Sequence, residues 1–256
     1  CLDERVQLLV VAGDLYDGDF RDYSTALFFA DQVSRLREIG AQVVWIRGNH
    51  DAQSRMTRHL RLSEGVHELS ADRAETRVFE DWGVAVHGQG YATRDVVANL
   101  ARAYPAALPG LFNIGVLHTA LDGRVGHAPY APCTTTELRS HGYDYWALGH
   151  VHQREVISTE PYVVFPGNLQ GRHAQEPGSK GATWLTLEDG RLIDVRHESV
   201  DVVRWSVLDV DVRSAQHFID VVEAASSALS AEQDRAEGRT LAARVRLLGA
   251  THLHGE

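Results

Sequence analysis

Side chains that commonly bind metal ions stand directly after several short apolar runs of the sequence. The runs end at residues 12, 46, 117 and 148. The potential ligands that follow them are Asp14, Asn49, His50, His118, His150 and His152. Each one alone has an ordinary explanation, since an aspartate after a strand often caps a helix and a lone histidine is often a hydrogen-bonded core residue. Their repeated position after buried strands indicates instead one shared metal site.

The mixture of ligand types suits a centre that binds a phosphate group. Asp14 has two oxygens and a full negative charge, so it can bridge two cations. Neutral imidazoles and the Asn49 amide complete the shells without adding charge that would repel a phosphate. Nitrogen and oxygen ligands together favour Mn²⁺, Fe²⁺ or Zn²⁺ over Ca²⁺. His150 and His152 lie two residues apart, so in extended chain they point the same way and can serve neighbouring ions.

His50 and Asp51 are the candidates for proton transfer. Two metal ions about 3.5–4 Å apart generate hydroxide at neutral pH and clamp the attacking and leaving oxygens of a phosphoryl displacement. His50, next to the ligand Asn49, would stabilise the transition state or protonate the leaving oxygen. Asp51 can fix the tautomer of His50. We therefore predict His50 and Asp51 as the catalytic residues.

Buried strands and an amphipathic helix alternate at the start of the chain. Residues 7–12 and 42–46 predict buried strands, and apolar residues at helical spacing between them predict a helix from Asp22 or Ser24 to Gly40. This alternation is typical of an α/β fold, whose sites collect at the carboxyl edge of the sheet. Further strands are expected over residues 77–79, 84–87, 113–117, 145–148, 162–165, 182–187 and 191–195.

Capping residues mark two more helices in this region. Thr93 predicts a short helix that reaches about residue 104. Thr134 and Glu137 form a capping box, which predicts a helix that Gly142 ends.

The composition changes near residue 201. The elements expected after that point are a strand over 205–212, a helix over 214–229, a polar turn over 231–238 and a strand over 241–247. We therefore predict a catalytic domain over residues 1–200 and the beginning of a small α+β capping or DNA-binding domain over residues 201–256.

Composition bounds the class of protein. The chain has 256 residues, of which 44% are apolar, enough for a real core and too many for a disordered chain. Its formal net charge of −10 argues against a surface that coats nucleic acid non-specifically. No apolar run approaches the ~20 residues that cross a bilayer, so no membrane association is expected. Cys1 and Cys133 are isolated, which fits a reducing cytoplasm.

Four short motifs carry a resemblance to a known family. They are Gly13-Asp14-Leu15-Tyr16-Asp17, Gly48-Asn49-His50-Asp51, Leu117-His118-Thr119 and Gly149-His150-Val151-His152. Together they resemble the successive motifs of the calcineurin-like metallophosphoesterase superfamily. Residues 166–173 and 178–182 are similar, more narrowly, to the DNA repair exonuclease branch of the SbcD and YhaO type.

The resemblance implies a fold, an activity and partners. The fold is a four-layer α/β/β/α sandwich, and the activity is that of a DNA-processing phosphodiesterase, an exonuclease, that uses two Mn²⁺ ions. The branch also implies a homodimer and an SMC-like ATPase partner.

The resemblance also assigns roles to individual residues. Asp14 becomes the bridging ligand, and the other ligands of the first metal become Asn49, His118 and His150. His152 binds the second metal, and His50 is the catalytic histidine. The predicted substrate contacts are Arg55, Arg172 and His173, with Arg55 one of several arginines around the Gly48 to Asp51 loop.

The sequence departs from the family pattern in one respect. The family opens with an Asp-x-His motif on a strand before the Gly-Asp motif, and no Asp-x-His occurs in this sequence. We expect that upstream residues carrying it are missing from this chain, and that a C-terminal capping domain is cut short. Two other function classes stay open: a phosphoesterase for phosphoproteins or cyclic nucleotides, and a non-catalytic scaffold.

The ligand count predicts unequal metal binding. The first metal keeps Asp14, Asn49, His118 and His150, whereas the second keeps only Asp14 and His152. Calorimetric titration of this polypeptide with Mn²⁺ should therefore show one tight and one weak site, and very low nuclease activity should accompany it. Two tight sites would contradict the ligand assignment.

Overall fold

A computed structural model describes residues 1–16, 24–54, 65–123 and 129–253 of the chain. The chain divides into two compact units, the first formed by residues 1–166 and 185–194 and the second by residues 167–184 and 195–256. The second unit thus includes residues 167–184, which the predicted division at residue 201 assigns to the catalytic domain. The Trp205 indole N–H donates a hydrogen bond to the Gly171 carbonyl (2.9 Å), and Gly178 forms a bridge with Trp205, which ties this segment to the second unit.

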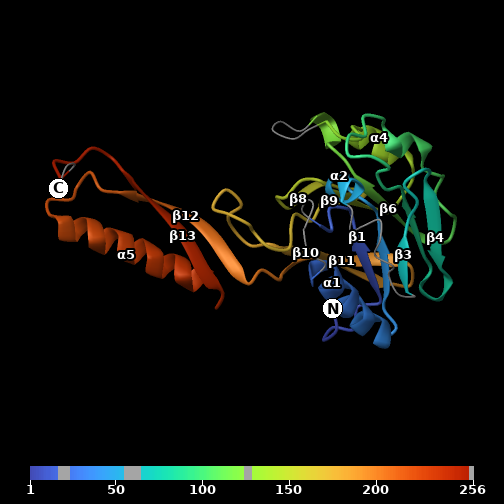
Figure 1. Cartoon of the computed structure of the whole chain (residues 1–256), viewed down its shortest axis with the longest axis horizontal. Helices are drawn as coiled ribbons and strands as arrows, with labels where there is room; N and C mark the ends of the chain where they lie inside the picture. Colours follow the sequence, from blue (N-terminus) through green and yellow to red (C-terminus); the bar gives the residue numbers. More distant parts are fainter. Residues whose placement is uncertain (17–23, 55–64, 124–128, 254–256) are drawn as a thin grey trace. The chain divides into compact units, whose positions relative to one another are not determined.

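The first unit contains two β-sheets (Figure 1). One is parallel, in the order β1 (Leu8–Val11), β2 (Gln42–Trp45), β3 (Val66–Glu68). The other has the order β4 (Glu75–Phe79), β5 (Val84–Gly88), β6 (Phe112–His118), β7 (Tyr145–Gly149), β9 (Tyr162–Phe165), β8 (Glu155–Thr159). Its central strands run parallel, and its edge strands β4 and β8 pair antiparallel.

Alternating side chains of β2 pack into two different layers of the first unit. Val43 points to α1 (Ser24–Glu38) and packs with Val33 and Leu36 of that helix. The next residue, Val44, belongs to the cluster between the two sheets, where it joins Val86 and Val116 of the other sheet. Because successive side chains of a strand face opposite ways, one strand contributes to both the helix layer and the inner layer.

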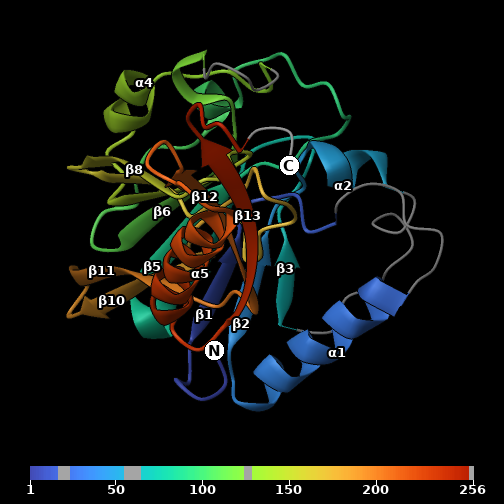
Figure 2. The same cartoon turned by 90° about the vertical axis from the view of Figure 1, so that its left-hand side faces the viewer.

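The six-stranded sheet repeats this division. Val116 of β6 lies in the inner cluster, while Leu117 lies in a separate cluster with Trp146 of β7 and Leu138 of α4 (Thr135–Ser140). The helices α1 and α4 thus cover the outer faces of the two sheets (Figure 2). This order of layers confirms the predicted α/β/β/α sandwich.

A hairpin adds apolar side chains to the inner cluster. It is formed by β10 (Gly181–Glu188) and β11 (Arg191–Ser199). Asp189 and Gly190 both have positive φ values, 49° and 73°, as a two-residue hairpin turn requires. Leu185, Leu187 and Leu192 pack against the cluster between the sheets.

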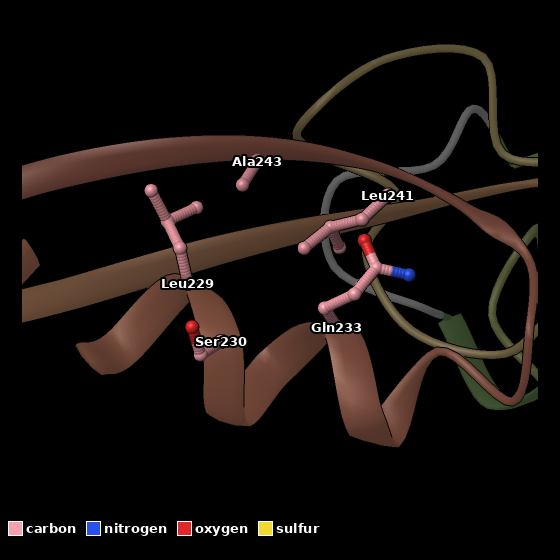
Figure 3. Close-up of a pocket in the computed structure, with 5 residues that line it drawn as sticks. All are labelled: Leu229, Ser230, Gln233, Leu241 and Ala243. Atoms are coloured by element: carbon pink, nitrogen blue, oxygen red, sulfur yellow. The ribbon is translucent and has the colours of Figure 1, made fainter. Parts of the chain in front are cut away.

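The second unit contains a βαβ unit. The strands β12 (Val203–Asp211) and β13 (Thr240–Leu248) pair in parallel, and α5 (Phe218–Arg235) connects them (Figure 1). Leu229 of α5 and Leu241 and Ala243 of β13 line a groove together with Ser230 and Gln233 (Figure 3). None of these side chains is ionisable. Among the described residues, no helix has the length and apolarity needed to span a membrane.

The prediction of a helix after Thr93 is wrong. Only a single 3-10 turn, Leu100–Ala103, forms there. The Val96 carbonyl accepts a hydrogen bond from the Ala131 amide (2.6 Å), so the backbone is engaged by another loop. Val97 is 77% exposed, so this apolar side chain contributes nothing to a buried helix face.

The predicted bounds of the last helix are also wrong. It begins at Phe218 rather than after Ser214, because the Asp220 carboxylate accepts hydrogen bonds from the amides of Gln216 and His217 and so caps the helix there. It continues to Arg235, through most of the expected turn. An Arg235–Glu232 ion pair (2.9 Å) lies on its last turn.

The capping box of α4 gives a test of the fold. The Thr134 hydroxyl accepts a hydrogen bond from the Glu137 amide (3.1 Å), and the Glu137 carboxylate accepts one from the Thr134 amide (2.9 Å). Thr134→Ala should lower the free energy of unfolding by about 1 kcal/mol in urea denaturation. Thr136→Ala, an exposed position in the same helix, is the matched control and should change it by less than about 0.5 kcal/mol. Equal losses in the two variants would contradict the capping role.

Candidate metal centre

Four strands of the first unit deliver the predicted ligands. Asp14 follows β1, Asn49 and His50 begin the short helix α2 (Asn49–Gln53) after β2, His118 ends β6, and His150 follows β7. Since β1 and β2 are neighbours in one sheet and β6 and β7 are neighbours in the other, the site draws on both sheets. Parallel strands end at a common edge, which brings residues more than 100 positions apart into contact.

Asp14, Asn49 and His118 converge on one point. The His118 Nε2 atom lies 3.0 Å from Asn49 Oδ1 and 3.5 Å from Asp14 Oδ2. The second carboxylate oxygen of Asp14 accepts a hydrogen bond from the His50 backbone amide (3.0 Å). The His150 ring lies edge-on to His118, with 5.3 Å between ring centroids. The structure therefore brings together three of the four ligands predicted for the first metal ion, and the fourth, His150, packs against His118.

Both ring nitrogens of His118 face oxygen atoms. While Nε2 faces Asn49 and Asp14, Nδ1 lies 2.9 Å from the Ala12 carbonyl oxygen. A neutral imidazole has a single N–H, so it can donate to only one side. Burial lowers the pKa of His118, with Asp14 offsetting this only in part, so the neutral ring is favoured. A divalent cation bound by Nε2, Asn49 Oδ1 and Asp14 Oδ2 would resolve the conflict, and these three atom types suit Mn²⁺, Fe²⁺ or Zn²⁺.

Two glycines let the loops come this close. A Cβ atom on Gly48 would lie 2.2 Å from Asp14 Oδ1, and one on Gly149 would lie 1.8 Å from the Ala12 carbonyl oxygen and 2.7 Å from His118 Nδ1. Asp14 and His150 themselves have positive φ values, 53° and 103°, which residues other than glycine rarely adopt. Strained backbone at two ligand positions is typical of a functional site.

Asp51 joins two of the loops. Its buried carboxylate accepts hydrogen bonds from the amides of Gly48 (2.9 Å), Leu15 (3.2 Å) and Tyr16 (3.1 Å). Burial raises the pKa of Asp51 to about 6, although these three bonds favour the ionised form. The carboxylate thus fixes the Asp14 loop to the Asn49 loop, a role that its position in the sequence did not reveal. Its predicted effect on the His50 tautomer stays a prediction.

The remaining predicted ligands are less closely gathered. Among the described residues, no three His, Cys, Asp or Glu side chains lie close enough together to hold a metal ion, and the convergent set includes the amide of Asn49. His152 is half-buried and lies near enough to contribute to the electrostatics of His118. Metal binding by His150 and His152 stays a prediction.

Two of the three predicted substrate contacts belong to the second unit. Arg55 is outside the described residues. Arg172 and His173 are exposed side chains of the second unit, and the Arg172 guanidinium pairs with the buried Glu176 carboxylate (3.0 Å). Their contact with substrate stays a prediction.

Thr119 and Tyr130 support the site, although no role was predicted for them. The Thr119 amide donates to the Gly149 carbonyl (3.2 Å), and its hydroxyl donates to the Ala131 carbonyl (2.8 Å), so Thr119 joins the ends of β6 and β7. The Tyr130 ring packs edge-on against His150, with 5.7 Å between centroids. Thr119 lies within the Leu117-His118-Thr119 motif, but Tyr130 has no signal in the sequence.

The layered fold and its polar edge define the class of protein. Two sheets between helices, with carboxylate, amide and imidazole groups at their meeting strand ends, form the scaffold of a metal-binding α/β sandwich protein. Comparison with known families narrows this class. Residues 1–154 match the family model described as calcineurin-like phosphoesterase, and residues 205–256 match the one described as the middle domain of metallophosphoesterase YhaO.

Two relatives agree with these matches. The chain is 37% identical over 219 residues to a Bacillus subtilis protein named uncharacterized metallophosphoesterase YhaO, covering 84% of this chain and 53% of that protein. It is 29% identical over 206 residues to the DNA double-strand break repair protein Mre11 of Methanopyrus kandleri, covering 73% of this chain and 42% of that protein. The chain spans about half the length of these relatives.

The chain belongs to the calcineurin-like phosphoesterase family. The YhaO middle-domain match and the two relatives support its place in the branch of the SbcD and YhaO type. The resemblance inferred from the four motifs is therefore confirmed.

Asp51 gives a test of how the site is held. Asp51→Asn keeps the size of the side chain but places an NH₂ group where one oxygen accepts backbone amides. It should lower the free energy of unfolding by about 2 kcal/mol and weaken Mn²⁺ binding about tenfold in calorimetry.

The control for Asp51 is Asp144, which contacts β6 near its first residue, away from His118. Asp144 Oδ2 accepts a hydrogen bond from the Asn113 amide (2.7 Å), so it also joins backbone segments. Asp144→Asn should leave Mn²⁺ affinity within about twofold, because no ligand loop is involved. Unchanged Mn²⁺ affinity in Asp51→Asn would show that this carboxylate does not hold the ligands in place.

Proposed function

We propose that the chain is a divalent-metal-dependent phosphodiesterase that acts on DNA. The single observation that carries the proposal is the position of His118, whose two ring nitrogens face oxygens from two other loops, the one after β1 and the one after β2. Oxygen atoms on both sides of a buried imidazole suit a cation on the Nε2 side. Family membership supports phosphate esters as the substrate class.

In the proposed reaction, Asp14, Asn49 and His118 hold one cation, joined by His150, and Asp14 and His152 hold a second. When bound, divalent cations supply charge to the phosphate oxygens and make hydroxide available at neutral pH. Mn²⁺ is the proposed ion, with Fe²⁺ or Zn²⁺ compatible with the same ligands. His50 is half-buried beside the ligand Asn49, where it can stabilise the developing charge or protonate the leaving oxygen.

DNA as the substrate rests on the relatives and on local charge. The similarity to Mre11, a protein named for double-strand break repair, supports DNA over small esters. Since the chain has a net charge of −10, phosphate contacts require local cationic side chains, for which we propose Arg55, Arg172 and His173. We also propose exonuclease activity in DNA repair, a cytoplasmic location, a homodimer and an SMC-like ATPase partner, as expected of the SbcD and YhaO type.

His50→Ala tests the proposed role of His50. Loss of a general acid should lower kcat by about 10²–10⁴-fold while Mn²⁺ affinity stays within about threefold. His252→Ala, an exposed histidine of the second unit, is the control and should retain full activity. The measurement is cleavage of DNA and of a small chromogenic phosphodiester at Mn²⁺ concentrations high enough to fill both the tight and the weak site. Full activity in His50→Ala would contradict its role.

The same assay separates the alternatives. Cleavage of DNA supports the proposal, whereas cleavage of the small diester without DNA cleavage indicates another phosphoesterase. If Mn²⁺ fills both sites but neither substrate is cleaved, the chain acts as a non-catalytic scaffold.

A further inference from the structure

Tyr91 lies between two of the ligand loops. It follows β5, and its backbone amide donates a hydrogen bond to the Arg47 carbonyl (2.9 Å), two residues before Asn49. The preceding residue, Gly90, passes so close to this loop that a Cβ atom there would lie 2.8 Å from the Arg47 amide nitrogen. The segment before Tyr91 is therefore in direct backbone contact with the Asn49 loop.

The side chain of Tyr91 reaches the opposite loop. Its hydroxyl donates a hydrogen bond to the His118 carbonyl (2.7 Å). Its ring packs edge-on against the His118 imidazole, with 5.3 Å between centroids and an interplanar angle of 85°. The same ring is fully buried in a cluster with Ala52 of α2 and Ala131. One residue thus contacts both the helix that begins with Asn49 and the ligand His118.

We infer that Tyr91 is a positioning residue for the metal centre: it fixes the separation of the Asn49 and His118 loops so that Asn49 Oδ1 and His118 Nε2 face the same cation. The inference rests on the proposed metal-dependent function and extends it to a residue outside the ligand motifs. Two bonds, one from the backbone and one from the side chain, join loops that belong to different sheets. Because the ring also packs on the imidazole, it limits rotation of His118.

The chemistry of the phenol suits this role. A tyrosine hydroxyl keeps its proton at neutral pH, so it remains a donor. The His118 carbonyl is its acceptor, and Nε2 of the ring is left to the cation. Tyr91 therefore acts through His118 and Asn49 and contributes no ligand atom.

Tyr104 offers a matched control, because its hydroxyl also bonds to a carbonyl of β6. Its hydroxyl donates to the Val116 carbonyl (2.7 Å), two residues before His118, and its side chain is also buried. It additionally accepts a hydrogen bond from the Gln89 amide (2.9 Å). Tyr91→Phe and Tyr104→Phe thus remove the same group from similar surroundings, but only Tyr91 joins two ligand loops.

The experiment compares Mn²⁺ binding by the full chain, Tyr91→Phe and Tyr104→Phe, using calorimetry, with urea denaturation of each metal-free protein. Tyr91→Phe should weaken Mn²⁺ binding about tenfold. Tyr104→Phe should lose comparable stability yet bind Mn²⁺ within about twofold of the unchanged chain. Tyr91→Trp, which keeps an aromatic ring without the phenol, should not restore affinity.

The outcomes are distinct. Unchanged Mn²⁺ affinity in Tyr91→Phe overturns the inference, and so does an equal loss of affinity in both phenylalanine variants, which would reflect general loosening of β6. If the unchanged chain binds no Mn²⁺, the proposed metal-dependent function fails, and the inference fails with it. If the unchanged chain binds Mn²⁺ tightly and Tyr91→Phe has no effect, the inference is contradicted and the proposed metal-dependent function is not.

Discussion

The hydrogen-bonding needs of a buried imidazole constrain the site. His118 is fully buried, and a neutral ring there cannot donate from both nitrogens, yet both face oxygens. Burial opposes protonation of the ring, so a bound cation is the other way to balance the oxygens that face Nε2. The strand ends, the glycines at 48 and 149, and the positive φ of Asp14 allow oxygen atoms to approach both nitrogens of this ring.

Loop-to-loop hydrogen bonds hold this arrangement together. Asp51 joins the Asp14 and Asn49 loops, Tyr91 joins the Asn49 and His118 loops, and Thr119 joins the ends of β6 and β7. Each link crosses between strands that the fold brings together. A preformed site loses less conformational freedom when it binds a cation, so these links favour tight binding.

Sequence reasoning identified the parts of the site that are local. Apolar runs followed by Gly-Asp, Gly-Asn-His-Asp or a single histidine predicted the strands. They also predicted the positions of Asp14, Asn49 and His118, because the end of a parallel strand defines an edge. The Thr134 capping box likewise predicted α4 correctly, since its hydrogen bonds span only three residues.

The parts that sequence reasoning missed depend on distant contacts. Nothing near Thr93 shows that the Val96 carbonyl would bind Ala131, and nothing near Tyr91 shows that its hydroxyl would reach His118. The start of α5 was misplaced because Asp220, rather than Ser214, supplies the cap. Such contacts are set by packing, which local propensity does not encode.

X-ray absorption spectroscopy of the Mn²⁺-loaded chain tests the central claim most directly, because it reports the atoms around the ion. Ligands from both sheets predict a shell of mixed nitrogen and oxygen atoms with the outer-shell scattering of imidazole rings, no sulfur, and loss of an imidazole contribution in His118→Ala. An all-oxygen shell, or one unchanged by His118→Ala, would show that the cation binds elsewhere and would contradict the account.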